Sequence, residues 1–209
     1  MKRRSLIIFL TCIACCALVA SFLPKAVSTD GLRQGDIIFQ VSRSGQSTAI
    51  QLATHSKYSH VGMLMRQDNR WYVYEAERGV ELTDLQEWIA RDPQHHYVIK
   101  RLKQNDLLTP AAIAKLKNEG RKFLGRPYDP YFRWSDDEMY CSELVWKTYK
   151  NALGVEVGKL RKLKDFDLTS PTVKRQLALR YGDKVPLDST VVSPADVFDS
   201  PILCLVKTE

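Results

Sequence analysis

A cysteine in polar surroundings is the residue of this sequence best suited to covalent chemistry. Cys141 begins the segment 141–153, whose apolar residues recur at helical spacing, and the polar residues 135–138 precede it. A thiol at the N-terminus of a helix faces unpaired backbone N–H groups and the positive end of the helix dipole, which favour the thiolate. The same N–H groups could stabilise the oxyanion that forms when a thiolate attacks a carbonyl. The alternative is that Cys141 is a small residue that fills the core beneath the helix.

A thiol nucleophile normally needs an imidazole as its base, and all four histidines precede Cys141 in the chain. His55 lies at the end of a predicted helix, where a cation meets the helix dipole favourably. His95 and His96 lie in a predicted loop. His60 begins an apolar strand after a turn rich in serine and tyrosine, so we predict it to be the base. The alternative for His60 is a structural role in the strand.

The hairpin that contains His60 suggests a third member of the site. The segments 60–66 and 71–77 have the pattern of two strands joined by a short connection. If the turn centres on residues 68–69, His60 faces residue 77, and Glu75 lies two positions away on the same face. Glu75 interrupts an apolar run, which favours a specific partner over an ordinary surface charge. A register slip of one residue would remove it from the site.

The remaining elements follow one another without regular alternation of strand and helix. Capping signals place helix starts at Thr83, Thr109, Ser170 and Ser193. We therefore predict an α+β domain over residues 30–209, an antiparallel sheet of about five strands packed with helices, and exclude a doubly wound parallel sheet. The predicted strands cover 35–40, 60–66, 71–77, 97–102 and 202–207, and the longer helices cover 47–55, 109–124 and 141–153.

The first 26 residues differ in composition from the rest of the 209-residue chain, whose 44% hydrophobic and 26% charged residues are typical of a globular protein. Three basic residues precede an apolar run from Leu6 to Leu23, the pattern of a signal peptide, although the run is also long enough for an N-terminal anchor. Without this segment the chain has 27 basic and 24 acidic residues, a net charge of +3. That charge is too small to predict a nucleic-acid partner. We expect an exported protein that could associate with a membrane through residues 1–26.

Cys141 and Cys204 are the cysteines that follow the leader. They could pair in an oxidising compartment, but Cys204 lies in an apolar run typical of a buried strand, whereas Cys141 begins a helix. His55 and His60 are five residues apart, which does not suit helical metal ligands, and neither Cys-x-x-Cys nor His-Glu-x-x-His occurs. There is also no glycine-rich phosphate loop and no Gly-x-Ser-x-Gly motif. The sequence therefore predicts no metal or cofactor.

Five short motifs carry a resemblance to a known family. In order they are GDIIF at 35–39, YSHVGM at 58–63, EA at 75–76, GRPYD at 125–129 and YCSELV at 140–145. Together they resemble the circularly permuted papain-like amidases and cysteine peptidases of the NlpC type, most closely the YiiX-like group of the bacterial envelope. The similarity covers residues 32 to 203.

The resemblance implies a triad of Cys141, His60 and Glu75. It also implies that Asp36 and Tyr58 border the cleft, and we expect Tyr128 and Tyr140, in the later motifs, to contact substrate there. A wider relative with the same permuted order, the lecithin:retinol acyltransferase group, acts on lipid acyl groups. The substrate class is therefore open between a small peptide and a lipid-like amide or ester.

These observations predict a thiol-dependent hydrolase of the bacterial periplasm or envelope. It would act on an amide or ester bond through a thioester on Cys141, with His60 as base and then acid and Glu75 orienting it. Acyl transfer would use the same steps. The alternative is a noncatalytic envelope protein that binds a lipid or peptide in the same cleft.

Overall fold

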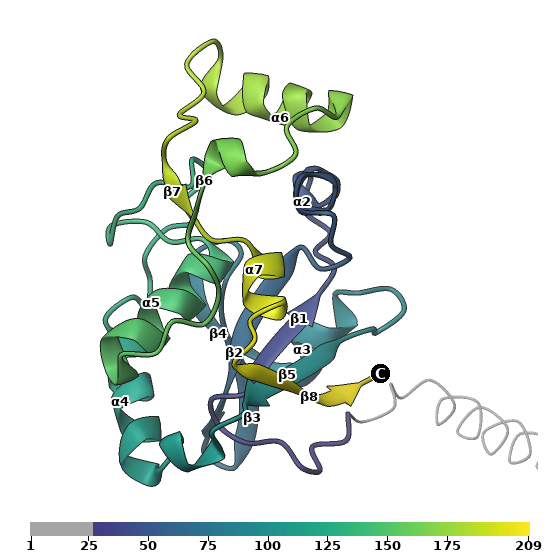
Figure 1. The fold of residues 1–209 in the computed structure, drawn as a ribbon. Coiled ribbons are helices and arrows are strands. Elements are labelled where there is room, and N and C mark those ends of the chain that lie inside the picture. Colours follow the sequence, from purple (N-terminus) through teal and green to yellow (C-terminus); the bar gives the residue numbers. More distant parts are fainter. Residues whose placement is uncertain (1–26) are drawn as a thin grey trace, which may run out of the picture.

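The fold is built on one six-stranded sheet with helices on both faces. The computed structural model describes residues 27–209, and Figure 1 shows the sheet at its centre. Neighbouring strands are antiparallel, in the order β4-β3-β2-β1-β5-β8. The strands are β1 (Ile37–Gln40), β2 (His60–Gln67), β3 (Arg70–Ala76), β4 (Val80–Asp84), β5 (Val98–Leu102) and β8 (Leu203–Thr208). The predicted α+β class is confirmed, and the additional strand is β4.

Helices surround the sheet, and a second, two-stranded sheet lies beyond it. Within residues 27–209 the α-helices are α2 (Ser47–Thr54), α3 (Leu85–Ala90), α4 (Pro110–Arg121), α5 (Cys141–Leu153), α6 (Pro171–Tyr181) and α7 (Pro194–Phe198). Short 3-10 helices cover Asn105–Leu107 and Leu163–Asp165. The small sheet pairs β6 (Arg161–Lys162) with β7 (Thr190–Val191). In Figure 1, α6 projects beyond the main sheet, and α2 lies between α6 and the sheet.

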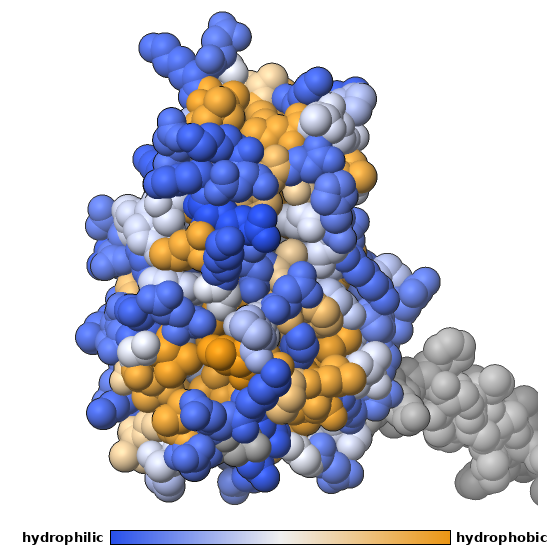
Figure 2. Space-filling view, in the orientation of Figure 1, coloured by the Kyte–Doolittle hydropathy of each residue, from blue (hydrophilic) through white to orange (hydrophobic). Residues whose placement is uncertain are grey.

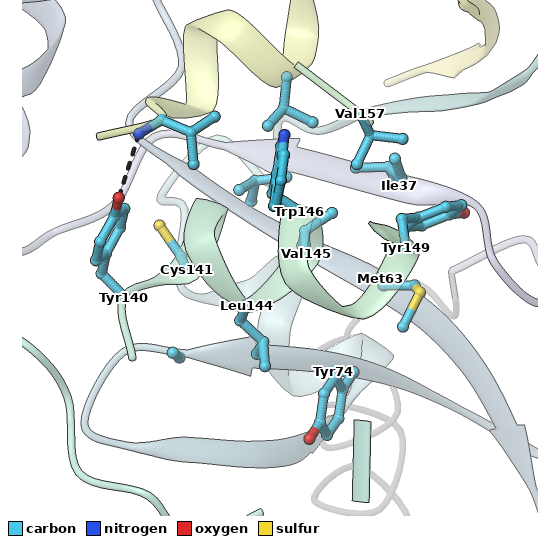
Figure 3. Close-up of a cluster of buried hydrophobic side chains, with 14 of the residues drawn as sticks. Ile37, Met63, Tyr74, Tyr140, Cys141, Leu144, Val145, Trp146, Tyr149 and Val157 are labelled. Atoms are coloured by element: carbon cyan, nitrogen blue, oxygen red, sulfur yellow. Dashed lines mark hydrogen bonds between the residues drawn. The ribbon is translucent and has the colours of Figure 1, made fainter. Parts of the chain in front are cut away.

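The two faces of the sheet carry separate apolar cores, because side chains alternate along each strand. On one face Ile37, Met63 and Tyr74 join a buried cluster with Leu144 and Tyr149 of α5, which Figure 3 shows in close-up. The opposite face has a second cluster, formed by Ile38, Leu64, Val73 and Ile99 of the sheet and Leu85, Trp88 and Ile89 of α3. The sheet is therefore buried on both sides near its centre.

The hairpin of β2 and β3 has the predicted register. Asp68 and Asn69 connect the strands with φ of 49° and 63°, the left-handed conformation that a two-residue hairpin turn requires at both positions. Met63 pairs with Tyr74, and Gln67 pairs with Arg70. This register places His60 and Glu75 on the same face of the sheet.

The predicted leader, residues 1–26, lies outside the part of the chain that the structure describes. Within residues 27–209, none of the helices has the length and apolar character needed to cross a membrane.

Gly62 offers a test of the packing between β2 and β3. A Cβ atom at this position would lie 2.3 Å from Val73 Cγ1 and 3.5 Å from Glu75 Cβ. We expect Gly62→Ala to lower the free energy of unfolding by about 1–3 kcal/mol, the usual cost of overpacking a core, as measured by urea denaturation. Gly45→Ala is the matched control, because a Cβ there meets nothing within 4 Å. Equal stabilities of the two variants would contradict the packing described here.

Candidate active site

Cys141 is the first residue of α5, and its side chain is buried. Its two neighbours are both fixed to Val192, which follows β7. The Tyr140 hydroxyl accepts a hydrogen bond from the Val192 N–H at 3.2 Å, and the Ser142 hydroxyl donates to the Val192 carbonyl at 2.8 Å. Figure 3 shows Cys141 beside Tyr140 at the first turn of the helix. The sulfur is therefore held at the helix N-terminus, where backbone N–H groups lack helical partners.

His60 begins β2 and is bonded to Glu75 on the neighbouring strand β3. The distance from His60 Nε2 to Glu75 Oε2 is 2.5 Å, and both side chains are buried. The ring of Trp88 stacks on the imidazole with 5.8 Å between the ring centres. Because Nε2 faces Glu75, the ring nitrogen left for Cys141 is Nδ1.

The Glu75 carboxylate receives three hydrogen bonds besides that from His60. Trp88 Nε1 donates to Oε2 at 2.8 Å, while Thr83 Oγ1 and Arg91 Nη1 donate to Oε1 at 2.5 and 2.7 Å. Burial raises the pKa of Glu75, but the hydrogen bonds and charges of His60, Thr83 and Arg91 outweigh it and lower the pKa from 4.5 to about 2. Glu75 is thus a carboxylate throughout the neutral range.

His60 is held in its protonated form by its two neighbours. Burial lowers the pKa of the imidazole, but hydrogen bonds and charge interactions with Cys141 and Glu75 raise it from 6.5 to about 10. A cationic imidazole between a cysteine and a carboxylate stabilises the thiolate, which is the reactive form of the nucleophile. The geometry can therefore support nucleophilic attack by sulfur followed by proton transfer from the ring.

The groups that hold Glu75 come from β4 and α3, and the sequence had not identified them. Thr83 was predicted to be the N-cap of a helix, but that cap is Asp84, whose Oδ1 accepts the Gln86 N–H at 3.0 Å. Thr83 instead lies on β4 and turns its hydroxyl to Glu75. Arg91, which follows α3, also bonds to Glu77 at 2.6 Å. The capping signal located the helix to within one residue and missed the function of the strand before it.

A cavity of about 100 Å³ lies next to Cys141, between α2, α6 and the start of α5. Tyr128 and Tyr140, the two tyrosines predicted to contact substrate, both line it. Gln46 also lines it and donates from Nε2 to the Tyr128 hydroxyl at 2.5 Å. The other lining residues are mostly apolar: Ala49, Ile50, Ala53, Phe132, Leu163, Phe166, Leu168, Val173, Leu177, Val191, Val192 and Pro194.

Asp36 and Tyr58, which the resemblance implied to border the cleft, do not line this cavity. Asp36 is fully buried and forms a two-pronged ion pair with Arg101, at 2.6 Å to Nε and 2.7 Å to Nη2. It precedes β1 at the end opposite Gln40, the residue that pairs with His60. Tyr58 packs against Phe198 in the core, with 4.5 Å between ring centres. Both residues have structural roles in this arrangement.

Cys141 and Cys204 are both free thiols, so the alternative of a disulfide between them is wrong. Cys204 lies on β8, where it pairs with Arg101 of β5. Its sulfur makes a long contact of 3.5 Å with the Arg101 carbonyl. The thiol of Cys141 is therefore available for chemistry.

A cysteine at a helix start, with a strand histidine and a strand carboxylate that precede it in the chain, defines a papain-like thiol site in permuted order. Residues 31–207 match the model of a family described as "Permuted papain-like amidase enzyme, YaeF/YiiX, C92 family". This match covers most of the chain, which therefore belongs to the permuted papain-like amidase family.

Two relatives from Escherichia coli support the assignment. The uncharacterized protein YiiX of strain K12 is 52% identical over 175 residues, which cover 84% of this chain and 86% of the relative. A crystal structure described as the metalloprotein yiiX is 51% identical, with a TM-score of 0.82, and the match covers 85% of this chain and 97% of that one.

Among residues 27–209, no three His, Cys, Asp or Glu side chains are grouped so that they could hold a metal ion. The side chains of these residues therefore do not form a set of ligands that fits a metal ion.

The pKa values of the buried pair predict how stability depends on pH. The folded pKa of His60 is above its usual 6.5, so the stabilisation it gives is complete below pH 6.5 and is lost as the pH rises towards about 10. The folded pKa of Glu75 is below 4.5, so its contribution is complete above pH 4.5 and is lost as the pH falls towards about 2.

We expect the difference in unfolding free energy between the wild type and Glu75→Gln to be largest between pH 4.5 and 6.5 and to shrink on both sides. Urea denaturation at a series of pH values measures it. Asp84→Asn, which removes an exposed ion pair with Arg70, is the control and should show a small effect. A difference for Glu75→Gln that does not vary with pH would show that the two groups are not charged partners.

Proposed function

We propose that this protein is a thiol hydrolase of the bacterial envelope that cleaves an amide or ester bond of an acyl compound through a thioester on Cys141. The observation that carries the proposal is the buried chain of contacts from Cys141 through His60 to Glu75. The basic and apolar leader at residues 1–26 supports export. Membership of an amidase family supports acyl chemistry.

The reaction would proceed in two steps, acylation of Cys141 and hydrolysis of the thioester. The Cys141 sulfur attacks the carbonyl carbon, and the bond to the leaving nitrogen or oxygen breaks as His60 gives its proton to that atom. Water then attacks the thioester and passes a proton to His60. Release of the carboxylic acid restores the thiolate and the imidazolium. An acceptor alcohol or amine in place of water would give acyl transfer.

Two donors are suited to stabilise the oxyanion in both steps. One is the backbone N–H at the start of α5, which has no helical acceptor. The other is the Tyr128 hydroxyl: it accepts a hydrogen bond from Gln46, which leaves its own proton free to point into the cavity. Burial, and then the nearby charge of Cys141, raise the pKa of Tyr128 well above its usual value. The hydroxyl therefore stays protonated and able to donate.

The loss of turnover in single variants tests the proposed roles. With a 4-nitrophenyl ester as substrate, we expect Cys141→Ala to abolish the release of nitrophenol. Glu75→Gln should lower kcat by a smaller factor, because the nucleophile and the base remain while the orientation of the ring is weakened. Cys204→Ala, which removes the other thiol of the described chain, is the control and should leave the rate unchanged.

Unchanged turnover in Cys141→Ala would rule out the proposed mechanism. If the wild type binds acyl compounds in the cavity but never turns them over, the protein is the binding protein that the sequence left as the alternative.

The apolar lining of the cavity favours an apolar acyl group over a charged peptide side chain. An apolar cavity of about 150 Å³ can hold benzene, so a cavity of about 100 Å³ has room for a group of a few carbon atoms. Figure 2 shows apolar side chains at the end of the molecule that carries α6, where Leu179 is 76% exposed. These side chains could extend the apolar path beyond the cavity.

Acyl chain length gives a second test of the function. Each buried methylene is worth about 0.8 kcal/mol, or about a fourfold gain. We expect kcat/KM for 4-nitrophenyl esters to rise about fourfold per carbon from acetate to hexanoate in the wild type. Ala49→Trp, which would fill the cavity, should remove this dependence and leave the acetate rate nearly unchanged. A flat series in the wild type would show that the acyl group does not enter the cavity.

A further inference from the structure

One cation faces the cavity beside Cys141. Among the described residues that line this cavity, Arg180 of α6 is the one with a cationic side chain, and none is an Asp or Glu. Its Nη2 donates to Gln46 Oε1 at 2.5 Å, and its guanidinium lies 4.4 Å from the centre of the Phe132 ring. It also contacts the hydroxyl of Tyr181. These neutral contacts hold the guanidinium in place without neutralising its charge.

Other arginines with a restrained side chain in this protein have carboxylate partners. Arg91, Arg101 and Arg161 meet acidic residues at 2.6–2.7 Å. Within residues 27–209, no Asp or Glu side chain forms an ion pair with Arg180. Arg180 is partly exposed, so water still solvates part of its guanidinium, and an anion bound at the cavity would take the place of that water. The guanidinium has five N–H donors, so its contacts with Gln46 and Tyr181 leave donors available.

Arg180 lines the same cavity as Cys141, the proposed nucleophile. Gln46 joins Arg180 to Tyr128 through the two ends of its amide, and Tyr128 and Cys141 line the same cavity. A group bound by Arg180 would therefore lie within the same small site as the bond to be cleaved. A planar guanidinium fork suits a carboxylate or a phosphate, which it can bind with two parallel hydrogen bonds.

We propose that Arg180 binds an anionic group of the substrate, a carboxylate or a phosphate, while the apolar part of the same molecule fills the cavity. The substrate class is then an anionic amphiphile with an acyl bond. The inference rests on the proposed function for the identity of this ligand as the substrate. Arg180 acts in recognition, and the neutral contacts to Gln46 and Phe132 orient it for that role.

Binding to the Cys141→Ala variant tests the inference without any turnover. The probes are hexanoylglycine, its neutral amide hexanoylglycinamide, and hexyl phosphate, each titrated by calorimetry. We expect at least one of the two anions to bind about tenfold more tightly than the neutral amide, the gain typical of hydrogen bonds to a charged group. The comparison of hexanoylglycine with hexyl phosphate shows which anion the site prefers.

Variants of two arginines on α6 test whether the preference for anions depends on Arg180. Adding Arg180→Gln to Cys141→Ala should remove the preference for the anion, and Arg180→Lys should keep part of it. Arg175→Gln is the matched control, because Arg175 is exposed on α6 and does not line the cavity. Equal affinity for charged and neutral probes in Cys141→Ala would overturn the proposal. So would a preference that survives Arg180→Gln, or an equal loss for all probes in both Arg180 variants.

The outcome is separable from that for the proposed function. Selective anion binding with no turnover in the wild type would contradict the proposed hydrolase function and support the proposed anion site at Arg180. Turnover in the wild type with no preference for the anionic probes would support the hydrolase function and contradict the anion site.

Discussion

The buried ion pair between His60 and Glu75 is the interaction on which the proposed site depends. A buried charge is tolerated only when its partners replace the water it has lost. Glu75 meets this condition through four donors, which come from β2, β4, α3 and the residue after α3. The carboxylate therefore keeps its charge, and the interactions of His60 with Cys141 and with this carboxylate keep the imidazole protonated. Three separate elements must pack correctly before the cysteine has its partner.

The rest of the fold brings the nucleophile to this pair. Helix α5 packs on the sheet face opposite α3. Its first residue, Cys141, lies next to His60 at the start of β2. Val192, more than 50 residues further along the chain, binds both neighbours of Cys141 and fixes the start of the helix. The same late segment and α6 also wall the cavity. The permuted order thus supplies α2, the base and the carboxylate before the nucleophile, and the remaining walls of the cavity after it.

Local signals in the sequence were sufficient to pair Glu75 with His60, because this pairing depends on the short-range geometry of one hairpin. The turn at Asp68 and Asn69 sets the hairpin register, and the register alone places Glu75 with His60. Residues that act through long-range packing were not predictable in this way. The sequence around Thr83 predicted a helix cap, whereas its hydroxyl binds Glu75. Nothing in the sequence near Arg101 indicates that its partner is Asp36, 65 residues away. Arg180 and Gln46 meet only because α6 packs beside α2.

The proposed function depends on one step, the formation of a thioester on Cys141 with help from His60. Intact mass spectrometry after brief mixing with 4-nitrophenyl hexanoate tests it most directly. The wild type should gain the mass of one hexanoyl group, and peptide mapping should locate that group on Cys141. His60→Gln should acylate at least 100-fold more slowly, the lower end of the contribution of a general acid–base group. Acylation elsewhere in the chain, or equal rates in the wild type and His60→Gln, would contradict the account.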